Sequence, residues 1–359
     1  LLLDDGRVVM VVEEVAADEL RCRVLIGGPL SDHKGINRRG GGLTAPALTD
    51  KDKADIKLAA DMDLDYVAVS FPRDAKDMEY ARRLLTEAGG KAWLVAKIER
   101  AEAVADDDAL DGLIRASDAV MVARGDLGVE IGDAELVGIQ KKIILHARRN
   151  NKVVITATQM MESMIHSPMP TRAEVSDVAN AVLDYTDAVM LSAESAAGEY
   201  PVEAVKAMAR VCQGAEKHPT SQKSSHRLGQ TFDRCDESIA LASMYTANHF
   251  PGIKAIICLT ESGFTPLIMS RIRSSVPIYA YSPHRETQAR VAMFRGVETI
   301  PFDPAALPAE KVSQAAVDEL LKRGVVTKGD WVILTKGDSY TAQGGTNTMK
   351  VLHVGDLLV

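Results

Sequence analysis

The sequence predicts an α/β protein built from two units of mainly parallel sheet covered by helices. From Thr49 onward, short apolar strand-like runs alternate with helical stretches, which is the pattern of repeated strand–helix units. Two capping-box signatures mark helix starts, Thr49 with Asp52 and Thr171 with Glu174. A polar stretch at 218–231, containing Pro and Gly, separates the first α/β unit from the second.

The chain before Thr49 has a different pattern. Residues 1–44 read as β structure, because short β-branched runs are separated by acidic turns. The glycine run at 40–42 then indicates either a hinge to the next unit or a plain surface loop.

The first α/β unit occupies residues 45–217. Its expected strands lie at 66–71, 92–99, 119–126, 153–160 and 188–194. The clearest helical spacing joins Val175, Val178, Ala179, Val182 and Leu183.

The second α/β unit occupies residues 232–359, and we interpret 218–231 as a linker. Its expected strands lie at 255–260, 277–281, 331–335 and 350–354. Its expected helices lie at 236–249, 265–273, 286–294 and 311–323.

Composition argues against several classes of function. A net charge of −8 and a pI of about 5.6 give no general reason to bind nucleic acid, and 4% aromatic residues argue against a base-stacking surface. The sequence contains no run of 18 apolar residues, so it does not predict a membrane-spanning helix. Four widely spaced cysteines without a CxxC pair fit a reducing compartment, so we expect a cytoplasmic protein.

Polar residues close each of the five strands of the first unit. Ligands of parallel α/β folds bind at the carboxyl ends of strands, so these residues predict a ring of functional groups. They are Ser70 and Phe71, Lys97 to Glu99, Arg124 to Asp126, Thr156 to Gln159, and Ser192 to Glu194.

Lys97, Glu99 and Asp126 are the strongest candidates for chemistry within this ring. Lys97 and Glu99 are two residues apart, so they point to the same face of their strand. If the strands of Glu99 and Asp126 are neighbours, about 4.8 Å separates their axes, and the two carboxylates repel unless a cation intervenes. An all-oxygen donor set favours Mg²⁺ or Mn²⁺ over zinc. The alternative is a buried ion network without a metal.

Glycines and hydroxyls surround this candidate site. Gly125 and Gly128 allow an anion to approach backbone N–H groups, although a strand-to-helix turn also needs glycine. Thr158 and Ser192 place hydroxyls at strand ends, where a threonine by default caps a helix.

The second unit carries a candidate anion site in the segment TESGFTP. The segment follows a strand and precedes a helix, so its hydroxyls and amides predict an anion cradle, with ordinary helix capping as the alternative. The loop at 336–348 could close over the same ligand. The candidate effector-binding residues are Thr260, Glu261, Ser262, Gly263 and Thr265.

Taken together, these segments resemble the pyruvate kinase family. The matching motifs run in the family's order over essentially the whole chain, and their details resemble bacterial members activated by sugar phosphates. They are HKGIN, LTDKDKADI, VAVSFPRDA, AKIERAEA, VMVARGDLGVEI, TATQMMESMI, PTRAEVSDVANAV and MLSAESAAGEYP.

The resemblance implies a (β/α)₈ TIM barrel with an inserted β lid domain, a C-terminal α/β domain, and a homotetramer. On this basis, residues 45–217 are five barrel units and residues 1–44 the second part of the lid. We therefore expect the first three barrel strands and the potassium ligands to precede Leu1, and the chain as given to be inactive.

The resemblance also implies phosphoryl transfer from phosphoenolpyruvate to ADP, which gives pyruvate and ATP. Glu99 and Asp126 match the ligands of the divalent metal, Mg²⁺ or Mn²⁺. Lys97 matches the lysine that stabilises the transferring phosphoryl group and the enolate, and Thr158 a threonine that helps protonate the enolate.

Further matches complete the implied site. Ala123, Arg124 and Gly125 match a segment whose backbone meets the substrate carboxylate. Lys34 matches a lid lysine near the nucleotide phosphates, and Ser262 with its neighbours matches the phosphate loop for a sugar-phosphate effector.

One departure and two alternatives remain. The family's usual Gly-Glu-Thr is Ala193-Glu194-Ser195 here, which keeps a hydroxyl. A Mg²⁺-dependent barrel lyase or mutase acting on an enolate would also use barrel carboxylates, but the second α/β unit and the lid segment argue against it. A non-catalytic fragment that binds sugar phosphate is the other alternative.

Overall fold

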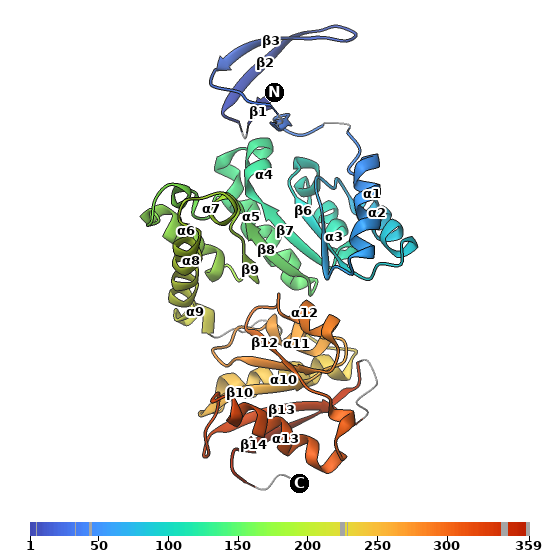
Figure 1. Cartoon of the computed structure of the whole chain (residues 1–359), viewed down its shortest axis with the longest axis vertical. Helices are drawn as coiled ribbons and strands as arrows, with labels where there is room; N and C mark the ends of the chain where they lie inside the picture. The colour runs from blue at the N-terminus through green and yellow to red at the C-terminus, as the bar shows by residue number, and fades with distance from the viewer. Residues whose placement is uncertain are drawn as a thin grey trace. The chain divides into compact units, whose positions relative to one another are not determined.

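The computed structural model describes residues 1–4, 6–32, 34–42, 45–222, 227, 229–338 and 344–356. His33 of the HKGIN motif, part of the interpreted linker and residues 339–343 of the loop at 336–348 lie outside the described residues. The chain divides into two compact units, Leu1–Met208 and Ala209–Val359. Each is described by itself (Figure 1).

The N-terminal segment forms a small antiparallel sheet, which confirms its β character. The strands lie in the order β3-β2-β1-β4. They are β1 (Leu2–Leu3), β2 (Val8–Val15), β3 (Leu20–Ile26) and β4 (Ile36–Asn37).

The rest of the first unit contains five parallel strands in chain order, as the sequence predicts (Figure 1). These strands are β5 (Tyr66–Val69), β6 (Trp93–Ile98), β7 (Ala119–Ala123), β8 (Val153–Ala157) and β9 (Ala188–Val189). The helices are α1 (Asp50–Asp61), α2 (Ala75–Glu87), α3 (Asp107–Ala116), α4 (Arg124–Ile131), α5 (Asp133–Arg149), α6 (Arg172–Leu183) and α7 (Ala193–Ala196), with the 3₁₀ helices η1 (Ala101–Val104) and η2 (Glu162–Ile165). Helix α8 (Pro201–Glu216) contains the boundary between the two units.

All five strands are shorter than the sequence predicts, three of them by three residues or more. The strand expected to reach Asp126 ends at Ala123, because α4 begins at Arg124. The strand expected to reach Met160 ends at Ala157, since Thr158 and Gln159 both adopt positive φ. The strand expected over 188–194 is reduced to Ala188–Val189.

Both predicted capping boxes are present. The Thr49 hydroxyl accepts from the Asp52 N–H at 3.2 Å, and the Asp52 carboxylate accepts from the Thr49 N–H at 2.7 Å. Thr171 and Glu174 form the same reciprocal pair at the start of α6. Each box satisfies two N–H groups that a helix start otherwise leaves unpaired.

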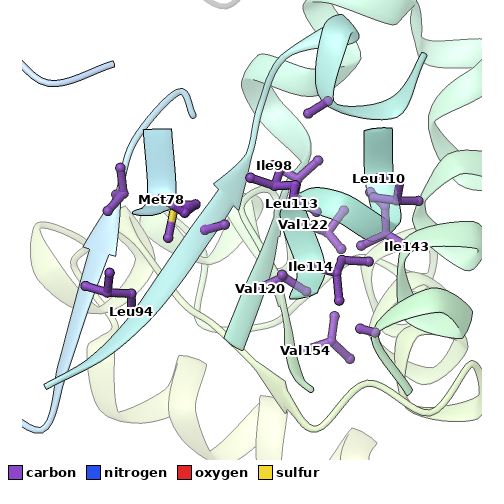
Figure 2. Packing of buried hydrophobic residues seen from close by; sticks show 14 of the residues in the cluster. Met78, Leu94, Ile98, Leu110, Leu113, Ile114, Val120, Val122, Ile143 and Val154 are labelled. Carbon is purple, nitrogen blue, oxygen red and sulfur yellow. The ribbon is translucent and has the colours of Figure 1, made fainter. Parts of the chain in front are cut away.

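The core of the first unit lies between the sheet and helices α2, α3 and α5. All five residues of β7 are buried, as expected of a parallel strand covered on both faces. Figure 2 shows valines of β7 and β8 packed against leucine and isoleucine side chains of α3 and α5. The labelled residues of this group are Leu110, Leu113, Ile114, Val120, Val122, Ile143 and Val154. This core makes the strand ends a rigid base for the site.

The second unit is a five-stranded sheet in the order β12-β11-β10-β13-β14, parallel except for β14. Its strands are β10 (Ile253–Leu259), β11 (Ile278–Ser282), β12 (Val297–Pro301), β13 (Trp331–Gly337) and β14 (Thr346–His353). Its helices are α9 (Pro219–Gln222), α10 (Cys235–His249), α11 (Phe264–Ser270), α12 (Arg285–Val291) and α13 (Ala309–Lys322), with η3 (Pro304–Ala306). The edge strand β12 was not predicted, and α9 lies within the interpreted linker.

Within the described part of the chain, none of the helices combines the length and apolar character needed to span a bilayer. The four cysteines, all among the described residues, are free thiols.

Candidate active site

Lys97 and Glu99 lie together at the carboxyl end of β6. The Lys97 Nζ atom is 2.6 Å from Glu99 Oε1 and donates to the Ser70 hydroxyl at 3.2 Å. Glu99 is buried, with 1% of its side chain exposed, and its Oε2 accepts from the Phe71 N–H at 2.7 Å. Residues at the ends of β5 and β6 therefore converge on one carboxylate.

Burial raises the pKa of the Glu99 carboxyl above its ordinary value. The charge and hydrogen bond of Lys97 oppose this rise, and the negative charge of Asp126 adds to it. The net direction is upward, so one lysine does not fully compensate the buried charge. A cation placed between Glu99 and Asp126 would stabilise both ionised carboxylates.

Asp126 is the third residue of α4, directly after β7. Since β6 and β7 are neighbours, its half-buried carboxylate lies near enough to Glu99 to affect the pKa of that group. The described residues contain no cluster of three His, Cys, Asp or Glu side chains that could hold a metal. Two carboxylates alone fit Mg²⁺ or Mn²⁺, which complete their coordination with water and substrate phosphate, better than zinc.

Thr158 lies beside the start of α4. Its Oγ1 accepts from the Gly125 N–H at 2.9 Å and donates to the Ala157 carbonyl at 2.7 Å. Thr158 thus caps a helix that follows the neighbouring strand rather than one in its own unit. The structure brings Gly125 and Thr158 together, 33 residues apart in sequence.

A hollow of about 420 Å³ opens beside this pair. Residues from the ends of β8 and β9 and from the N-terminal sheet line it. They are Arg7, Gly125, Thr158, Gln159, Glu162, Ile165, Ser192, Ala193 and Glu194. The hollow has the polar groups and the position expected of a small-molecule site in a parallel α/β unit.

Ala123 and Arg124 contribute differently from each other. Ala123 is buried and precedes the first turn of α4, so only its backbone can face a ligand. The Arg124 side chain is also buried and forms an ion pair with Asp177 on α6. Its guanidinium therefore contacts protein groups, and Gly125 is the residue of this segment that lines the hollow.

Glu194 is a functional candidate that the sequence pattern named only as a strand-end residue. It is 3% exposed and accepts from the backbone N–H groups of Met161 and Ser192, at 3.1 and 2.7 Å. These bonds join the segments that follow β8 and β9. Glu194 thereby fixes one wall of the hollow.

Lys34 lies in the N-terminal sheet region rather than in the wall of the hollow. Its Nζ is 2.9 Å from Asp4 Oδ1, and its side chain is 38% exposed. The Lys34 ammonium lowers the pKa of Asp4 through a hydrogen bond and its charge.

The predicted anion loop of the second unit borders a second hollow. Thr260, Glu261, Ser262 and Thr265 line it together with Gly337 and residues 344–346, so the two loops do face the same space. Two hydroxyls are already used within the protein. Thr260 Oγ1 accepts from the Gly263 N–H at 3.0 Å, and Thr265 is bonded to Thr346 at 2.9 Å. Among the described residues, the Ser262 hydroxyl has no hydrogen-bond partner.

Gly263 has a structural reason to be glycine. Its φ is +81°, and a Cβ there would lie 2.6 Å from a methyl carbon of Val291. The turn that presents Ser262 therefore depends on the absence of a side chain at the next position.

A lysine and hard oxygen donors at the carboxyl edge of a parallel sheet define an α/β enzyme suited to phosphoryl or enolate chemistry. Residues 1–205 match the family described as "Pyruvate kinase, barrel domain", and residues 237–352 match "Pyruvate kinase, alpha/beta domain". The chain belongs to the pyruvate kinase family, which confirms the resemblance seen in its motifs.

Curated relatives support the same assignment. Pyruvate kinase II of Salmonella typhimurium is 59% identical over 354 residues, which cover 99% of this chain and 74% of that protein. The pyruvate kinase of Haemophilus influenzae is 56% identical over 97% of this chain and 72% of its own length. That of Mycobacterium tuberculosis is 37% identical over 99% and 74%. The similarity covers both α/β units.

Proposed function

We propose that the carboxyl ends of β6, β7 and β8 form the active site for the pyruvate kinase reaction, phosphoryl transfer from phosphoenolpyruvate to ADP. The observation that carries this proposal is the convergence of Lys97 and Glu99 with Asp126, which lies in the first turn of the helix after the neighbouring strand. Phosphoryl transfer needs positioning and charge neutralisation more than covalent help, and these groups supply both.

Glu99 and Asp126 are proposed to hold Mg²⁺ or Mn²⁺. Their fit is supported by the repulsion between the buried Glu99 carboxylate and the half-buried Asp126 carboxylate, which a divalent cation would relieve. When bound, the ion would neutralise charge on the phosphoryl oxygens and on the enolate oxygen. The family's potassium requirement is proposed for the full-length parent, since its ligands are expected to lie outside this chain.

Lys97 adds a fixed positive charge to this site. Its Nζ is held by Glu99 and Ser70, so little reorganisation is needed when negative charge develops on the substrate. Lys97 therefore stabilises the transferring phosphoryl group and the enolate more than it stabilises the bound substrate.

Thr158 is the proposed group through which the enolate is protonated. Its hydroxyl now donates to the Ala157 carbonyl and must turn to donate to an enolate carbon. The backbone of Ala123, Arg124 and Gly125 is proposed to bind the substrate carboxylate, beside the N-terminus of α4. Both groups lie on rigid strand ends, which favours precise alignment.

The remaining assignments concern regulation and surroundings. Lys34 is proposed to contact nucleotide phosphates, and the hollow at Ser262 to bind a sugar-phosphate effector. We further propose a homotetramer acting in the cytoplasm, where the free thiols of this chain remain reduced.

A coupled assay tests the reaction itself, on the full-length parent rather than on the chain as given, which is expected to be inactive. All turnover measurements on variants use the same full-length protein. Pyruvate formation from phosphoenolpyruvate should require both ADP and Mg²⁺ or Mn²⁺. Pyruvate formed at the same rate without ADP would contradict the kinase reaction and indicate hydrolysis, with water as the phosphoryl acceptor. The family matches over both α/β units do not favour the lyase, mutase or non-catalytic alternatives.

A further inference from the structure

The turn after β8 has an unfavourable backbone conformation. Thr158 and Gln159 have φ values of +66° and +54°, so two successive residues with side chains occupy the left-handed region. Such a conformation is costly for L-residues and persists only where surrounding groups hold it. The turn also carries the Thr158 hydroxyl.

Arg124 is the side chain that holds this turn. Its Nη2 donates to the Thr158 carbonyl at 2.6 Å, and its Nε lies 3.2 Å from the carbonyls of both Ala157 and Thr158. The planar guanidinium therefore binds the peptide groups on both sides of the Thr158 Cα atom. Its side chain is only 6% exposed, so it acts from inside the protein.

Asp177 in turn orients Arg124. Its two carboxylate oxygens accept from Arg124 Nη1 at 2.8 and 2.6 Å. Asp177 belongs to α6, 53 residues further along the chain, and its side chain is 37% exposed. The pair thus connects α6 to the start of α4 and to the turn after β8.

Arg124 acts on both groups that meet at the site. Its backbone starts α4 and precedes Gly125, whose N–H is bonded to Thr158 Oγ1 at 2.9 Å. Its side chain fixes the turn that presents this same oxygen. We propose that Arg124, oriented by Asp177, is a positioning residue that places the Thr158 hydroxyl for the reaction; the catalytic part of this inference rests on the proposed role of Thr158.

Hydrogen exchange of the Gly125 amide tests the positioning without requiring turnover. In the Asp177→Asn chain, we expect this amide to exchange about tenfold faster, because the bond to Thr158 Oγ1 loosens. Asp184→Asn is the matched control, since it breaks the ion pair between Lys141 and the C-terminal end of α6. In the control, Gly125 exchange should stay at the wild-type rate.

A double-variant comparison shows whether both residues act through one bond. Thr158→Val removes the acceptor and should also increase Gly125 exchange, and adding Asp177→Asn should then produce no further increase. The proposal would be overturned if the double variant exchanged Gly125 faster than Thr158→Val alone. Equal increases of the exchange rate in the Asp177→Asn and Asp184→Asn chains would also overturn it.

Turnover separates this inference from the role given to Thr158. We expect Asp177→Asn to lower kcat about tenfold with little change in KM for phosphoenolpyruvate, while Asp184→Asn leaves both unchanged. Arg124→Lys keeps the positive charge but loses the planar guanidinium with its several N–H donors, so its kcat should be lowered in the same way. Faster Gly125 exchange with unchanged kcat would show that Asp177 and Arg124 position Thr158, and it would refute the claim that this positioning contributes to turnover.

Discussion

Replacing Lys97 by methionine tests the electrostatic basis of the proposed site. The change removes an ammonium that lies 2.6 Å from Glu99 Oε1 but keeps a side chain of similar length. Loss of one fixed group aimed at developing charge typically costs about 3–4 kcal/mol, or 10² to 10³ in kcat. We expect that loss in kcat, with a much smaller change in KM.

The same variant should lose stability in a pH-dependent way. Removing one partner of a buried ion pair costs about 3–5 kcal/mol when the other stays charged. Lys97 is 27% exposed and the pKa of Glu99 is already raised by burial, so Glu99 can take up a proton and we expect about 1–2 kcal/mol. A carboxyl with a raised folded-state pKa destabilises the protein as pH rises through that pKa. The free energy of unfolding of Lys97→Met should therefore fall further below that of the wild type at pH 8 than at pH 5.

Two measurements check these effects of Lys97→Met. The coupled assay gives kcat and KM, and urea unfolding at the two pH values gives the free energy of unfolding. A raised KM with normal kcat would show that Lys97 only binds substrate. A deficit that shrinks as pH rises would refute the assigned balance between Lys97 and Glu99.

Three further changes address the metal, the effector and acid stability. Asp126→Asn should weaken Mn²⁺ binding about 10- to 100-fold by calorimetry, and unchanged affinity would remove this residue from the metal site. Ser262→Asp should abolish calorimetric binding of a sugar phosphate such as glucose 6-phosphate by repulsion, whereas equal binding by both chains would exclude the loop. The Arg73 hydrogen bond lowers the pKa of Asp77, so the stabilisation is present at neutral pH and lost as pH falls through the folded-state pKa. Because Arg73 is 40% exposed, we expect Asp77→Asn to lower the free energy of unfolding by no more than about 1 kcal/mol at pH 7 and not at all at pH 2. Urea unfolding at both pH values measures this, and an equal loss at both would contradict a stabilising Arg73–Asp77 ion pair.

The elements that the sequence predicted are those with strong local signals. The capping boxes at Thr49 and Thr171 depend on residues three positions apart, and both formed as expected. Strand β12 gave no comparable signal, because its VETIP sequence is short, partly polar and belongs to a sheet edge. Strand ends were placed too late where the chain turns abruptly, as at Ala123.

The site was predictable to the extent that it depends on strand register. Lys97 and Glu99 share a face because they are two residues apart, and Asp126 joins them because β6 and β7 are neighbours. The partly buried contacts of Arg124 with Asp177 could not be predicted in this way. They join residues 53 positions apart, and no local pattern shows which way an arginine at a strand end points.

A repeated feature at the opposite end of the sheet was also not predicted from the sequence. Asp118 precedes β7, and its carboxylate accepts from the Leu94 N–H on β6 at 2.8 Å, while its own N–H donates to the Leu94 carbonyl at 2.9 Å. Asp187 precedes β9 and forms the same two bonds with Val154 on β8, at 2.9 Å each. The two aspartates stand in the same local sequence, Asp-Ala-Val-Met. Each pair fixes the register of one strand against its neighbour, and hence the height at which the site residues emerge.

Asp187→Ala tests this register contact. The substitution leaves the buried Val154 N–H without its acceptor, so we expect the free energy of unfolding to fall by about 1–3 kcal/mol. Asp187→Asn is the matched control because its amide oxygen can still accept, and it should cost less than half as much. Urea unfolding and exchange of the Val154 amide measure both effects. Equal losses in the two variants would mean that the charge of Asp187 matters rather than its hydrogen bond, and the register role would then have to be given up.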